Sequence, residues 1–474
     1  MAVCEYEKGE SRFRWRSNAF KIGFAGIVLL VFGAIFVFAS YLITGALSQE
    51  DVNSFAGFSQ KILFVSSWFS VAGWVIGSIG IGLLVVAVLV HWFAPDTLRL
   101  KWFAQQRLFS SRFGNPLGLK DGQVLPRIEV KRDTSGLWLS IWTTSNDADQ
   151  IARVSLALSG AARGKLRGYA VTVIDTDSAS SFVRFKFEDV TVDRSITVHS
   201  LEDLNSGDVT KLLVDHGTCI DLTRSGSMLA VGVTRSGKTS GVLALLLQVA
   251  RFGRDDFGSR VVIVDPKVAE LSQVSHTVTL DEKGSARPVL GVMRELEQVM
   301  KSRQALLNAA AAESGSPVKW WDYGMHPTFL FIDEFVALRS VFPARATKDD
   351  GGYNLKEFED SLKRLITMGA SAGVFVIVSI AQASTENLPS LFRDAFSTRF
   401  LFRPKRDQAR FLWDSRVIDN MPERVYRPGD AWFTSEDGVH DAITFVHFPY
   451  FAPDFGEYGE LSQLLRAYYS EQKT

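Results

Sequence analysis

Two long apolar segments dominate the first hundred residues of the chain. They run from Ile22 to Leu47 and from about Ile62 to Phe93. Each is longer than the roughly 20 helical residues that cross a bilayer, so the pattern predicts a transmembrane hairpin over 22–93. A cleaved signal peptide fits less well, because the first run is too long for one and a second run follows it. A buried helical hairpin in a soluble core stays as the alternative.

Charged residues are distributed unevenly around these two segments. Acidic Glu50 and Asp51 lie in the connector, with Lys61 at its end. The flanks towards the two termini are basic, and they contain Lys8, Arg12, Arg14, Arg16 and Lys21 before the first segment and Arg99, Lys101, Arg107 and Arg112 after the second. This asymmetry predicts a protein of the inner or plasma membrane with two spans, a cytoplasmic tail over 1–21, a short outer loop and both termini in the cytoplasm.

The pattern changes after the second apolar segment. Residues 94–125 contain several prolines and glycines and are predicted to be a juxtamembrane linker without a long helix. A small α+β domain is predicted over 126–206, with strands at Val171–Ile174 and Phe182–Phe187. A basic DNA-binding surface or an ordinary solvated face are both consistent with its charged residues, which are Arg163, Lys165, Arg167, Arg184 and Lys186.

In the rest of the chain, short apolar runs alternate with segments whose apolar residues have helical periodicity. The runs predict strands at Met228–Val231, Val261–Val264, Phe329–Ile332, Val374–Val378 and Phe400–Phe402. Helices are expected from Val242 to near Gly253, over Val292–Ala312 and over Leu355–Met368. Alternation of this kind predicts an α/β domain over 207–450, with a parallel sheet covered by helices on both faces, and a tail or helix over 451–474. Ligands of such sheets bind at the carboxyl ends of the strands.

A phosphate-binding loop follows the first of these strands. The pattern G-x-x-x-x-G-K-[ST] is matched by Gly232, Val233, Thr234, Arg235, Ser236, Gly237, Lys238 and Thr239, with Ser240 next in the helix. Backbone N–H groups and the helix dipole form an anion site, Lys238 can contact the β- and γ-phosphates, and Thr239 can hold Mg²⁺. Because a strand precedes the loop and a helix follows it, the sequence predicts binding of a nucleoside triphosphate such as ATP.

Polar residues end two of the other predicted strands. Asp333 and Glu334 follow the strand that ends at Ile332, and Gln382 follows the strand that ends at Val378. Asp333 is predicted to hold Mg²⁺, and Glu334 to polarise the water that attacks the γ-phosphate. Gln382 is predicted to bind the γ-phosphate or that water, with a glutamine that caps the strand-to-loop turn as the alternative.

Composition narrows the remaining possibilities. The 474 residues contain 52 basic and 52 acidic side chains, so net charge does not favour or exclude a nucleic-acid partner. Cys4 and Cys219 are the two cysteines, too few for a disulfide framework. The seven histidines show no zinc-ligand spacing, and Mg²⁺ is the one metal expected.

The order of the motifs resembles the FtsK/SpoIIIE DNA-translocating ATPases. The resemblance extends from about Lys211 to Phe433. Its most specific parts are Asp265-Pro266-Lys267 with Glu270-Leu271-Ser272 and the string Thr398-Arg399-Phe400-Leu401-Phe402-Arg403. Pro428-Gly429-Asp430 before a strand resembles the closing turn of the family. The resemblance implies a RecA-like P-loop motor that forms a ring, expected to be a hexamer, and moves double-stranded DNA through the centre.

In such a ring the resemblance implies ATP sites between subunits that an arginine from the neighbour completes. This chain departs from the family at Gly369–Gly373, where alanine stands at the position of a common family arginine. Candidates for the replacement are Arg364, Arg399, Arg403 and Arg410, of which Arg399 and Arg403 are the first choice. The loop Val341–Tyr353, with Arg345 and Lys348, is either a DNA contact or a surface loop.

Within the family, two spans with one compact motor resemble the FtsK-like coupling proteins of conjugative plasmids and integrative elements, of the TcpA type. We therefore expect a membrane-anchored translocase in conjugative DNA transfer, with other conjugation proteins as partners. Only about forty residues follow Asp430, which leaves no room for a winged-helix module that reads DNA sequence. The alternatives are a chromosome-partitioning pump without that module, a type VII-like secretion ATPase, and a membrane scaffold with an inactive nucleotide site.

Overall fold

The computed structural model describes residues 18–45, 56–109, 115–120, 123–133, 136–144, 146–160, 162–253, 260–345, 353–384, 386–415, 418 and 425–470. The predictions made above for the basic tail, the acidic connector and Lys348 lie outside these residues. The chain forms two compact units, one of residues 1–168 and 177–183, the other of residues 169–176 and 184–474. The predicted domain boundaries stay predictions.

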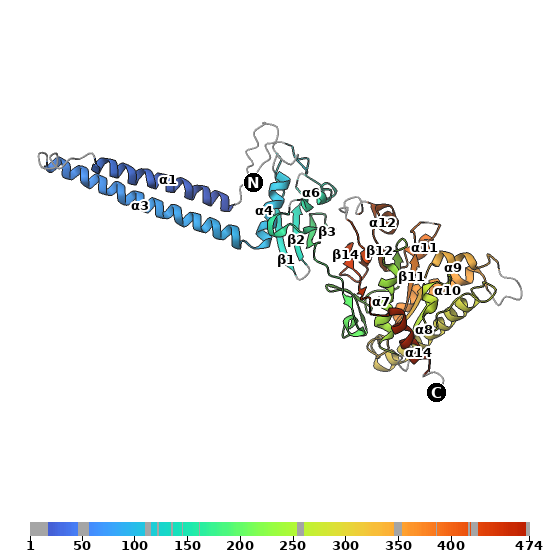
Figure 1. The fold of residues 1–474 in the computed structure, drawn as a ribbon. Helices are drawn as coiled ribbons and strands as arrows, with labels where there is room; N and C mark the ends of the chain where they lie inside the picture. The colour runs from blue at the N-terminus through green and yellow to red at the C-terminus, as the bar shows by residue number, and fades with distance from the viewer. Residues whose placement is uncertain are drawn as a thin grey trace. The chain divides into compact units, whose positions relative to one another are not determined.

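The first unit contains two long apolar helices that lie against each other (Figure 1). They are α1 (Asn18–Gly45) and α3 (Ala56–Phe93). Each contains a stretch long and apolar enough to cross a membrane, Ile22–Thr44 in α1 and Lys61–Leu89 in α3. Their side chains are mostly exposed, with 11% and 17% of the most apolar windows buried. This exposure is inconsistent with a hairpin buried in a soluble core, which was the alternative.

Glycines bring the two helices close together. A Cβ added at Gly26 would lie 2.8 Å from the Gly80 carbonyl oxygen, and one at Gly33 would lie 2.7 Å from that of Gly73. Backbones can approach this closely only where side chains are absent, as in helix pairs within membranes. Near the other end of the pair the Ser40 hydroxyl donates to the Ser66 carbonyl at 2.8 Å. Packing and polar contacts thus fix the pair along its length.

The predicted linker contains a regular helix. It is α4 (Asp96–Phe109), with Leu100, Ala104 and Leu108 fully buried at a helical spacing of four. Pro95 precedes this helix and does not interrupt it, as proline is tolerated at helix starts. The expectation of a linker broken throughout was wrong here. The remaining regular elements before residue 168 are β1 (Ile128–Asp133), β2 (Gly136–Trp142), α5 (Ala148–Ala152), α6 (Ser155–Ser159) and η2 (Gly164–Leu166), with β1 and β2 antiparallel.

The two strands predicted in the small domain are present as β3 (Tyr169–Thr176) and β4 (Phe182–Asp189). Their basic residues are paired with acids: Arg184 with Asp175, and the buried Lys186 with Glu188 at 2.9 Å. These two cations therefore do not contribute to an open basic surface. Short elements follow, namely β5 (Thr197–Val198), η3 (Leu201–Leu204), β6 (Lys211–Asp215) and β7 (Thr218–Asp221).

A seven-stranded sheet forms the centre of the second unit, in the order β14-β13-β12-β8-β11-β10-β9. Strands β12, β8, β11, β10 and β9 are mutually parallel, and β13 and β14 extend the sheet antiparallel at one edge. The strands are β8 (Met228–Val231), β9 (Val261–Val264), β10 (Thr328–Ile332), β11 (Val374–Ile380), β12 (Thr398–Phe402), β13 (Asp430–Ser435) and β14 (Thr444–His447). The predicted parallel sheet is confirmed.

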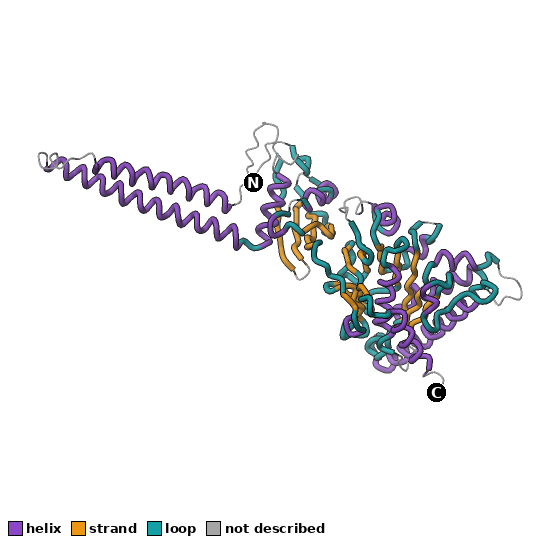
Figure 2. Tube along the Cα trace, in the orientation of Figure 1, coloured by secondary structure: helices purple, strands orange, loops and turns teal. Residues whose placement is uncertain are grey.

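Helices cover both faces of this sheet (Figures 1 and 2). Strand β10 shows why, since Phe331 packs into the core on one face and Leu330 into the core on the other. Helices α7 (Lys238–Ala250) and α14 (Glu457–Ser470) cover the Phe331 face, while α8 (Arg287–Ser314) and α10 (Leu355–Met368) contribute most to the Leu330 face. The other elements are η4 (Glu270–Gln273), α9 (Phe335–Val341), η5 (Gly369–Ala372), α11 (Ser390–Arg393), α12 (Arg406–Leu412) and β15 (Tyr450–Phe451).

Candidate functional site

The phosphate-binding loop lies between β8 and α7. The Gly232 N–H donates to the carbonyl of Ile380 at 3.1 Å, which ties the start of the loop to the end of β11. Within the loop the Ser236 N–H donates to the Val233 carbonyl at 3.1 Å. Helix α7 begins at Lys238, so the N–H groups of its first turn have no helical carbonyl to bind. Exposed Thr234, Arg235 and Ser240 and partly exposed Thr239 complete the loop and the start of the helix.

The turn before β13 contacts the phosphate loop. The Gly429 N–H donates to the Ser236 carbonyl at 2.9 Å. Gly237 has φ +86°, and a Cβ added there would overlap the backbone nitrogen of Gly429. Asp430 is buried and holds the turn, because its carboxylate accepts from the Arg427 N–H at 2.7 Å and lies 2.9 Å from His447 Nδ1. The resemblance had marked Pro428-Gly429-Asp430 as a turn before a strand, and the contact with the loop gives that turn a role.

Strained backbone is concentrated at the carboxyl ends of the parallel strands. The non-glycine residues with positive φ include Arg235 after β8, Val268 after β9, Glu334 after β10 and Arg403 after β12. These are four of the seven such residues among those described. Left-handed non-glycine residues cost of order 1–3 kcal/mol each and cluster at functional sites. Their shared edge is the one at which the sequence predicts ligand binding.

Lys238 and Asp333 are both withdrawn from solvent at this edge. Lys238 is 7% exposed, and burial lowers its pKa, opposed by the nearby carboxylates of Asp333 and Glu334. Burial raises the pKa of Asp333, and the positive charge of Lys238 opposes that rise. The Asp333 N–H donates to the Val264 carbonyl at 3.0 Å, which fixes the residue at the end of β10. The site therefore holds poorly solvated charges that a bound anion and cation can compensate.

Glu334 interacts with a lysine that the sequence analysis did not assign to the site. Its Oε1 lies 3.2 Å from Lys267 Nζ. Lys267 follows β9 in a loop that Asp265 organises, since the buried Asp265 carboxylate accepts N–H bonds from Lys267, Ala269 and Ser272 at 2.8–3.1 Å. The Asp265-Pro266-Lys267 motif was recognised in the sequence as part of the family resemblance. The contact of its lysine with Glu334 is visible only in the fold.

Gln382 lies just beyond the end of β11, the strand between β8 and β10. Its side chain is exposed and makes no hydrogen bond with the described residues, although its carbonyl accepts from Asn387 Nδ2 at 2.9 Å. The loop is held by another glutamine, because Gln408 Oε1 accepts the N–H of Ala383 at 2.7 Å. The side chain of Gln382 thus does not cap the turn in the described structure.

The two preferred arginines differ in their surroundings. Arg399 donates from Nε to the Phe396 carbonyl and from Nη1 to the Leu412 carbonyl, each at 3.1 Å, and burial lowers its pKa. Arg403 is exposed at the end of β12, next to the strand that leads into the phosphate loop. Arg399 thus acts as a structural tie within its own subunit, whereas the Arg403 side chain has no hydrogen-bond or ion-pair partner among the described residues.

The other two candidates are engaged in ion pairs. Arg364 forms a bidentate pair with the buried Glu297, at 2.9 and 3.0 Å, which joins α10 to α8. Arg410 lies 3.7 Å from Asp407 on α12. Arg345, from the loop after α9, is exposed. Arg403 differs from the two ion-paired candidates, because it directly follows Phe402, which lies against Gly232 of the phosphate loop, and its side chain has no ion pair among the described residues.

A cavity of about 500 Å³ adjoins the phosphate loop. Gly237 and Ser240 form one wall, and Asp430, Tyr450 and Glu457 are among the residues opposite. The Tyr450 side chain is 60% exposed and offers an aromatic surface. Ligand sites are commonly concave and of this size, with apolar and aromatic walls and a few polar groups. The cavity gives the loop a neighbouring space in which the rest of a nucleotide can fit.

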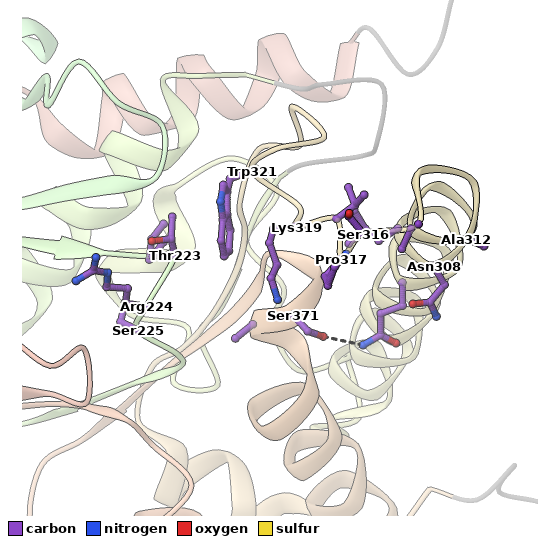
Figure 3. A pocket seen from close by; sticks show the side chains of 17 residues that line it. Thr223, Arg224, Ser225, Asn308, Ala312, Ser316, Pro317, Lys319, Trp321 and Ser371 are labelled. Atoms are coloured by element: carbon purple, nitrogen blue, oxygen red, sulfur yellow. Dashed lines mark hydrogen bonds between the residues drawn. The ribbon is translucent and has the colours of Figure 1, made fainter.

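A second cavity, of about 1040 Å³, lies away from the loop (Figure 3). It is lined by the segment that enters β8, the end of α8 and η5, with Arg224, Lys319 and Trp321 among its residues. Gln304 Nε2 donates to Ser371 Oγ at 3.1 Å on one side of it. Its lining residues 222–225 and 370–371 come shortly before β8 and β11 in the chain, so the cavity lies at the amino end of these strands. None of the predicted site residues lines it.

Comparison with known proteins identifies the family of this region. Residues 198–395 match the FtsK/SpoIIIE family, so this part of the chain is an FtsK/SpoIIIE P-loop ATPase domain. An FtsK domain-containing protein of Bacillus subtilis, YdcQ, is 24% identical over 173 residues, which are 36% of this chain and 33% of that protein. The DNA translocase FtsK of Bradyrhizobium diazoefficiens is 25% identical over 261 residues, 50% of this chain and 30% of the relative. The chain thus spans about a third of these relatives.

Solved structures are similar to parts of the chain at low sequence identity and with TM-scores below 0.5. The pCW3 conjugation coupling protein TcpA, with ATPγS, is 15% identical, with a TM-score of 0.44 over 72% of this chain and 93% of that one. The cytoplasmic domain of the type VII secretion ATPase EccC from Thermomonospora curvata is 16% identical, with a TM-score of 0.39 over 59% of this chain and 33% of that one.

Proposed function

We propose that the chain is a membrane-anchored, ATP-driven DNA translocase that serves as the coupling protein in conjugative DNA transfer. The observation that carries the translocase part is the meeting of the phosphate loop, Asp333 and Glu334 at one edge of the sheet, within an FtsK/SpoIIIE domain. The relatives named DNA translocase FtsK support DNA as the cargo.

ATP is proposed to bind with its phosphates on the N–H groups of the loop and first turn, where Lys238 contacts the β- and γ-phosphates. The nucleoside is proposed to occupy the adjoining cavity, against Tyr450. A Tyr450→Ala variant should then raise KM for ATP with little effect on kcat, because the lost contact is the same in the ground and transition states. An unchanged KM would place the base elsewhere.

The residues at the site fit magnesium. Asp333 offers a half-buried carboxylate and Thr239 a hydroxyl at the start of α7, and Mg²⁺ prefers such oxygen ligands together with water and phosphate. When bound, the ion would neutralise charge on the β- and γ-phosphates. A carboxylate that burial makes costly to ionise gains most from a nearby cation, so the raised pKa of Asp333 supports this assignment.

Hydrolysis is proposed to proceed by attack of water on the γ-phosphorus. The water oxygen forms the new P–O bond as the bond from the γ-phosphorus to the bridging oxygen breaks and ADP leaves with that electron pair. Glu334 accepts the proton of the water. Gln382 is proposed to orient the water or the γ-phosphate, and Arg403 to stabilise charge on the transferred group, either in its own subunit or across a subunit interface.

The wider assembly is also part of the proposal. The two apolar helices would anchor the protein in the cell membrane with the motor in the cytoplasm. The motor would form a hexameric ring around double-stranded DNA, with other conjugation proteins as partners.

The test is ATP hydrolysis by the full chain in lipid nanodiscs, with no DNA, with duplex DNA and with single-stranded DNA, beside Lys238→Ala. We expect turnover that duplex DNA stimulates, that salt weakens steeply and that the variant abolishes. Stimulation by single strands alone would correct the cargo. No stimulation by DNA, together with a response to a secreted protein, would favour the secretion ATPase instead.

The conjugative role needs a test in cells. Deletion of the gene in its host should remove donor ability in mating while leaving division normal, and wild type but not Lys238→Ala should restore it. Chromosomes trapped at septa with normal donor ability would instead identify a partitioning pump.

A further inference from the structure

The ion pair between Lys267 and Glu334 occupies a carboxylate that the proposed reaction requires. The side chain of Glu334 is 20% exposed, and its Oε1 lies 3.2 Å from Lys267 Nζ. A carboxylate that accepts a proton from water must be free to face that water. With Oε1 turned towards Lys267, Glu334 is engaged with a competing cation. The pair therefore opposes the catalytic arrangement rather than forming part of it.

The backbone on the Glu334 side is fixed. Glu334 has φ +49° and ψ +59°, and its carbonyl accepts from the N–H groups of Ala337 at 2.9 Å and Leu338 at 3.2 Å. This left-handed residue joins β10 directly to α9, so the main chain has little freedom there. Movement of the carboxylate must come from rotation of its own side chain. The position of the partner cation then decides which way the carboxylate points.

The Lys267 side is built differently. The Asp265 carboxylate anchors the loop through three N–H groups, one of them from Lys267 itself. Residues 267–270 are nevertheless exposed, and the Lys267 side chain is 51% exposed. Val268 adds an apolar side chain, 59% exposed, to the same surface. The loop is thus anchored at its base, while its tip is open to contact from a neighbouring subunit or a polymer.

Lys267 also acts on the phosphate loop. Burial is the main cause that lowers the pKa of Lys238, the carboxylates of Asp333 and Glu334 oppose it, and the positive charge of Lys267 adds a smaller lowering. Two cations and two carboxylates therefore share one small volume, and displacement of Lys267 changes the balance of charge around both Glu334 and Lys238. This placement distinguishes Lys267 from an ordinary surface lysine in an ion pair.

We propose that Lys267 is a positioning residue that restrains Glu334 in the resting motor and releases it when duplex DNA engages the loop 265–270. Hydrolysis is slow while the pair holds and accelerates when the Lys267 side chain turns away. The inference rests on the proposed ATPase function. It adds a residue through which DNA is coupled to turnover, a role that phosphate binding itself does not require.

The experiment compares Lys267→Met, which keeps length but removes charge, with Lys267→Arg, which keeps the pair. The control is Lys283→Met, at an exposed lysine in the turn of residues 281–284. ATP turnover of the full chain in nanodiscs is measured with and without duplex DNA, along with KM, ATPγS affinity and thermal unfolding. An exposed ion pair contributes little, so Lys267→Met should raise the DNA-free kcat about two- to fivefold.

The stimulated kcat, KM and unfolding temperature should stay near wild type in Lys267→Met, so that the ratio of stimulated to unstimulated turnover falls. Lys267→Arg and Lys283→Met should retain the wild-type ratio. An unchanged or lower DNA-free kcat in Lys267→Met would overturn the inference, the lower value showing that Lys267 assists hydrolysis directly. A wild type that does not hydrolyse ATP under any condition would overturn the proposed function instead.

Discussion

Gly429 donates its backbone N–H to the carbonyl of Ser236 at 2.9 Å, so the turn before β13 and the phosphate loop form one unit. The two segments are almost two hundred residues apart in the chain, and the strands that they adjoin, β13 and β8, are separated in the sheet by β12. Gly237 lies at the contact, since a Cβ there would overlap the Gly429 nitrogen. A phosphate loop that depends on a distant turn can be disrupted from either side.

Substitutions at the two glycines should therefore have different effects. Gly429→Ala places a Cβ at φ +90° with nothing closer than 3.6 Å, so it carries the left-handed penalty of about 1–2 kcal/mol and little else. Gly237→Ala adds the overlap with Gly429 to a similar penalty at φ +86°. We expect Gly237→Ala to abolish ATPγS binding and lower the thermal midpoint, and Gly429→Ala to lower the midpoint while retaining most binding. Equal affinity in both variants would contradict the contact.

The raised pKa of Asp333 predicts that its ionised carboxylate lowers the stability of the protein while being needed for activity. Burial raises its folded-state pKa above the ordinary 3.8, so the folded state binds the proton more tightly than the unfolded state does. Ionised Asp333 therefore costs stability at neutral pH, and this cost disappears as pH falls to 3.8, where the unfolded state is also protonated. Asp333→Asn should raise the thermal midpoint of the nucleotide-free protein at pH 7, with a smaller gain at pH 4, close to the pKa of the unfolded state, and should abolish magnesium-dependent hydrolysis.

Thermal unfolding without nucleotide or magnesium, at both pH values, checks this prediction. Asp281→Asn is the matched control, because that carboxylate caps a turn by accepting the N–H groups of Lys283 and Ser285. Its loss should lower the midpoint instead. An Asp333→Asn protein less stable than wild type at pH 7 would show that the attraction to Lys238 outweighs burial.

Much of the motor fold was predictable, because buried parallel strands carry continuous apolar runs and the phosphate loop has a fixed spacing. The strand expected at Phe329–Ile332 is β10, Thr328–Ile332. The pairing of Lys267 with Glu334 was not predictable, since it depends on β9 and β10 being neighbours and on the backbone reversal at Glu334. Helix α4 was missed because Pro95 was taken as an interruption although it stands at a helix start.

The different surroundings of Arg399, in β12, and Arg403, just after it, were also not predictable from the sequence. Arg399 and Arg403 are four residues apart, so strand alternation would place both side chains on one face. Arg403, however, lies past the strand end with φ +46°, which breaks the alternation. Arg399 is held by the carbonyls of Phe396 and Leu412, a contact that requires the connection through α12. The sequence shows the residue types but not this divergence.

Substitution of Arg399 and of Arg403 should distinguish a role in stability from a role in ATP hydrolysis. Arg399→Ala leaves two carbonyls without their donor and should destabilise the protein by about 1–3 kcal/mol, with loss of activity that follows unfolding. Arg403→Ala should leave the thermal midpoint within about one degree of wild type and lower kcat, because the side chain has no bonded partner among the described residues. Measurement of the thermal midpoint and of kcat for each variant tests this prediction. A destabilised Arg403→Ala with normal kcat per folded molecule would remove Arg403 from the proposed site.

Two glutamines near the end of β11 offer a closely matched comparison. Gln408 accepts the N–H of Ala383, a residue only 8% exposed, so Gln408→Ala should leave that donor unsatisfied and cost about 1–3 kcal/mol. The Gln382 side chain is exposed and unbonded among the described residues, so Gln382→Ala should not change stability. If Gln382 orients the attacking water, its variant should lower kcat by about 10- to 100-fold while ATPγS affinity stays constant. A Gln382→Ala protein with wild-type kcat would leave Gln382 as a surface residue and shift attention to Arg403 and Glu334.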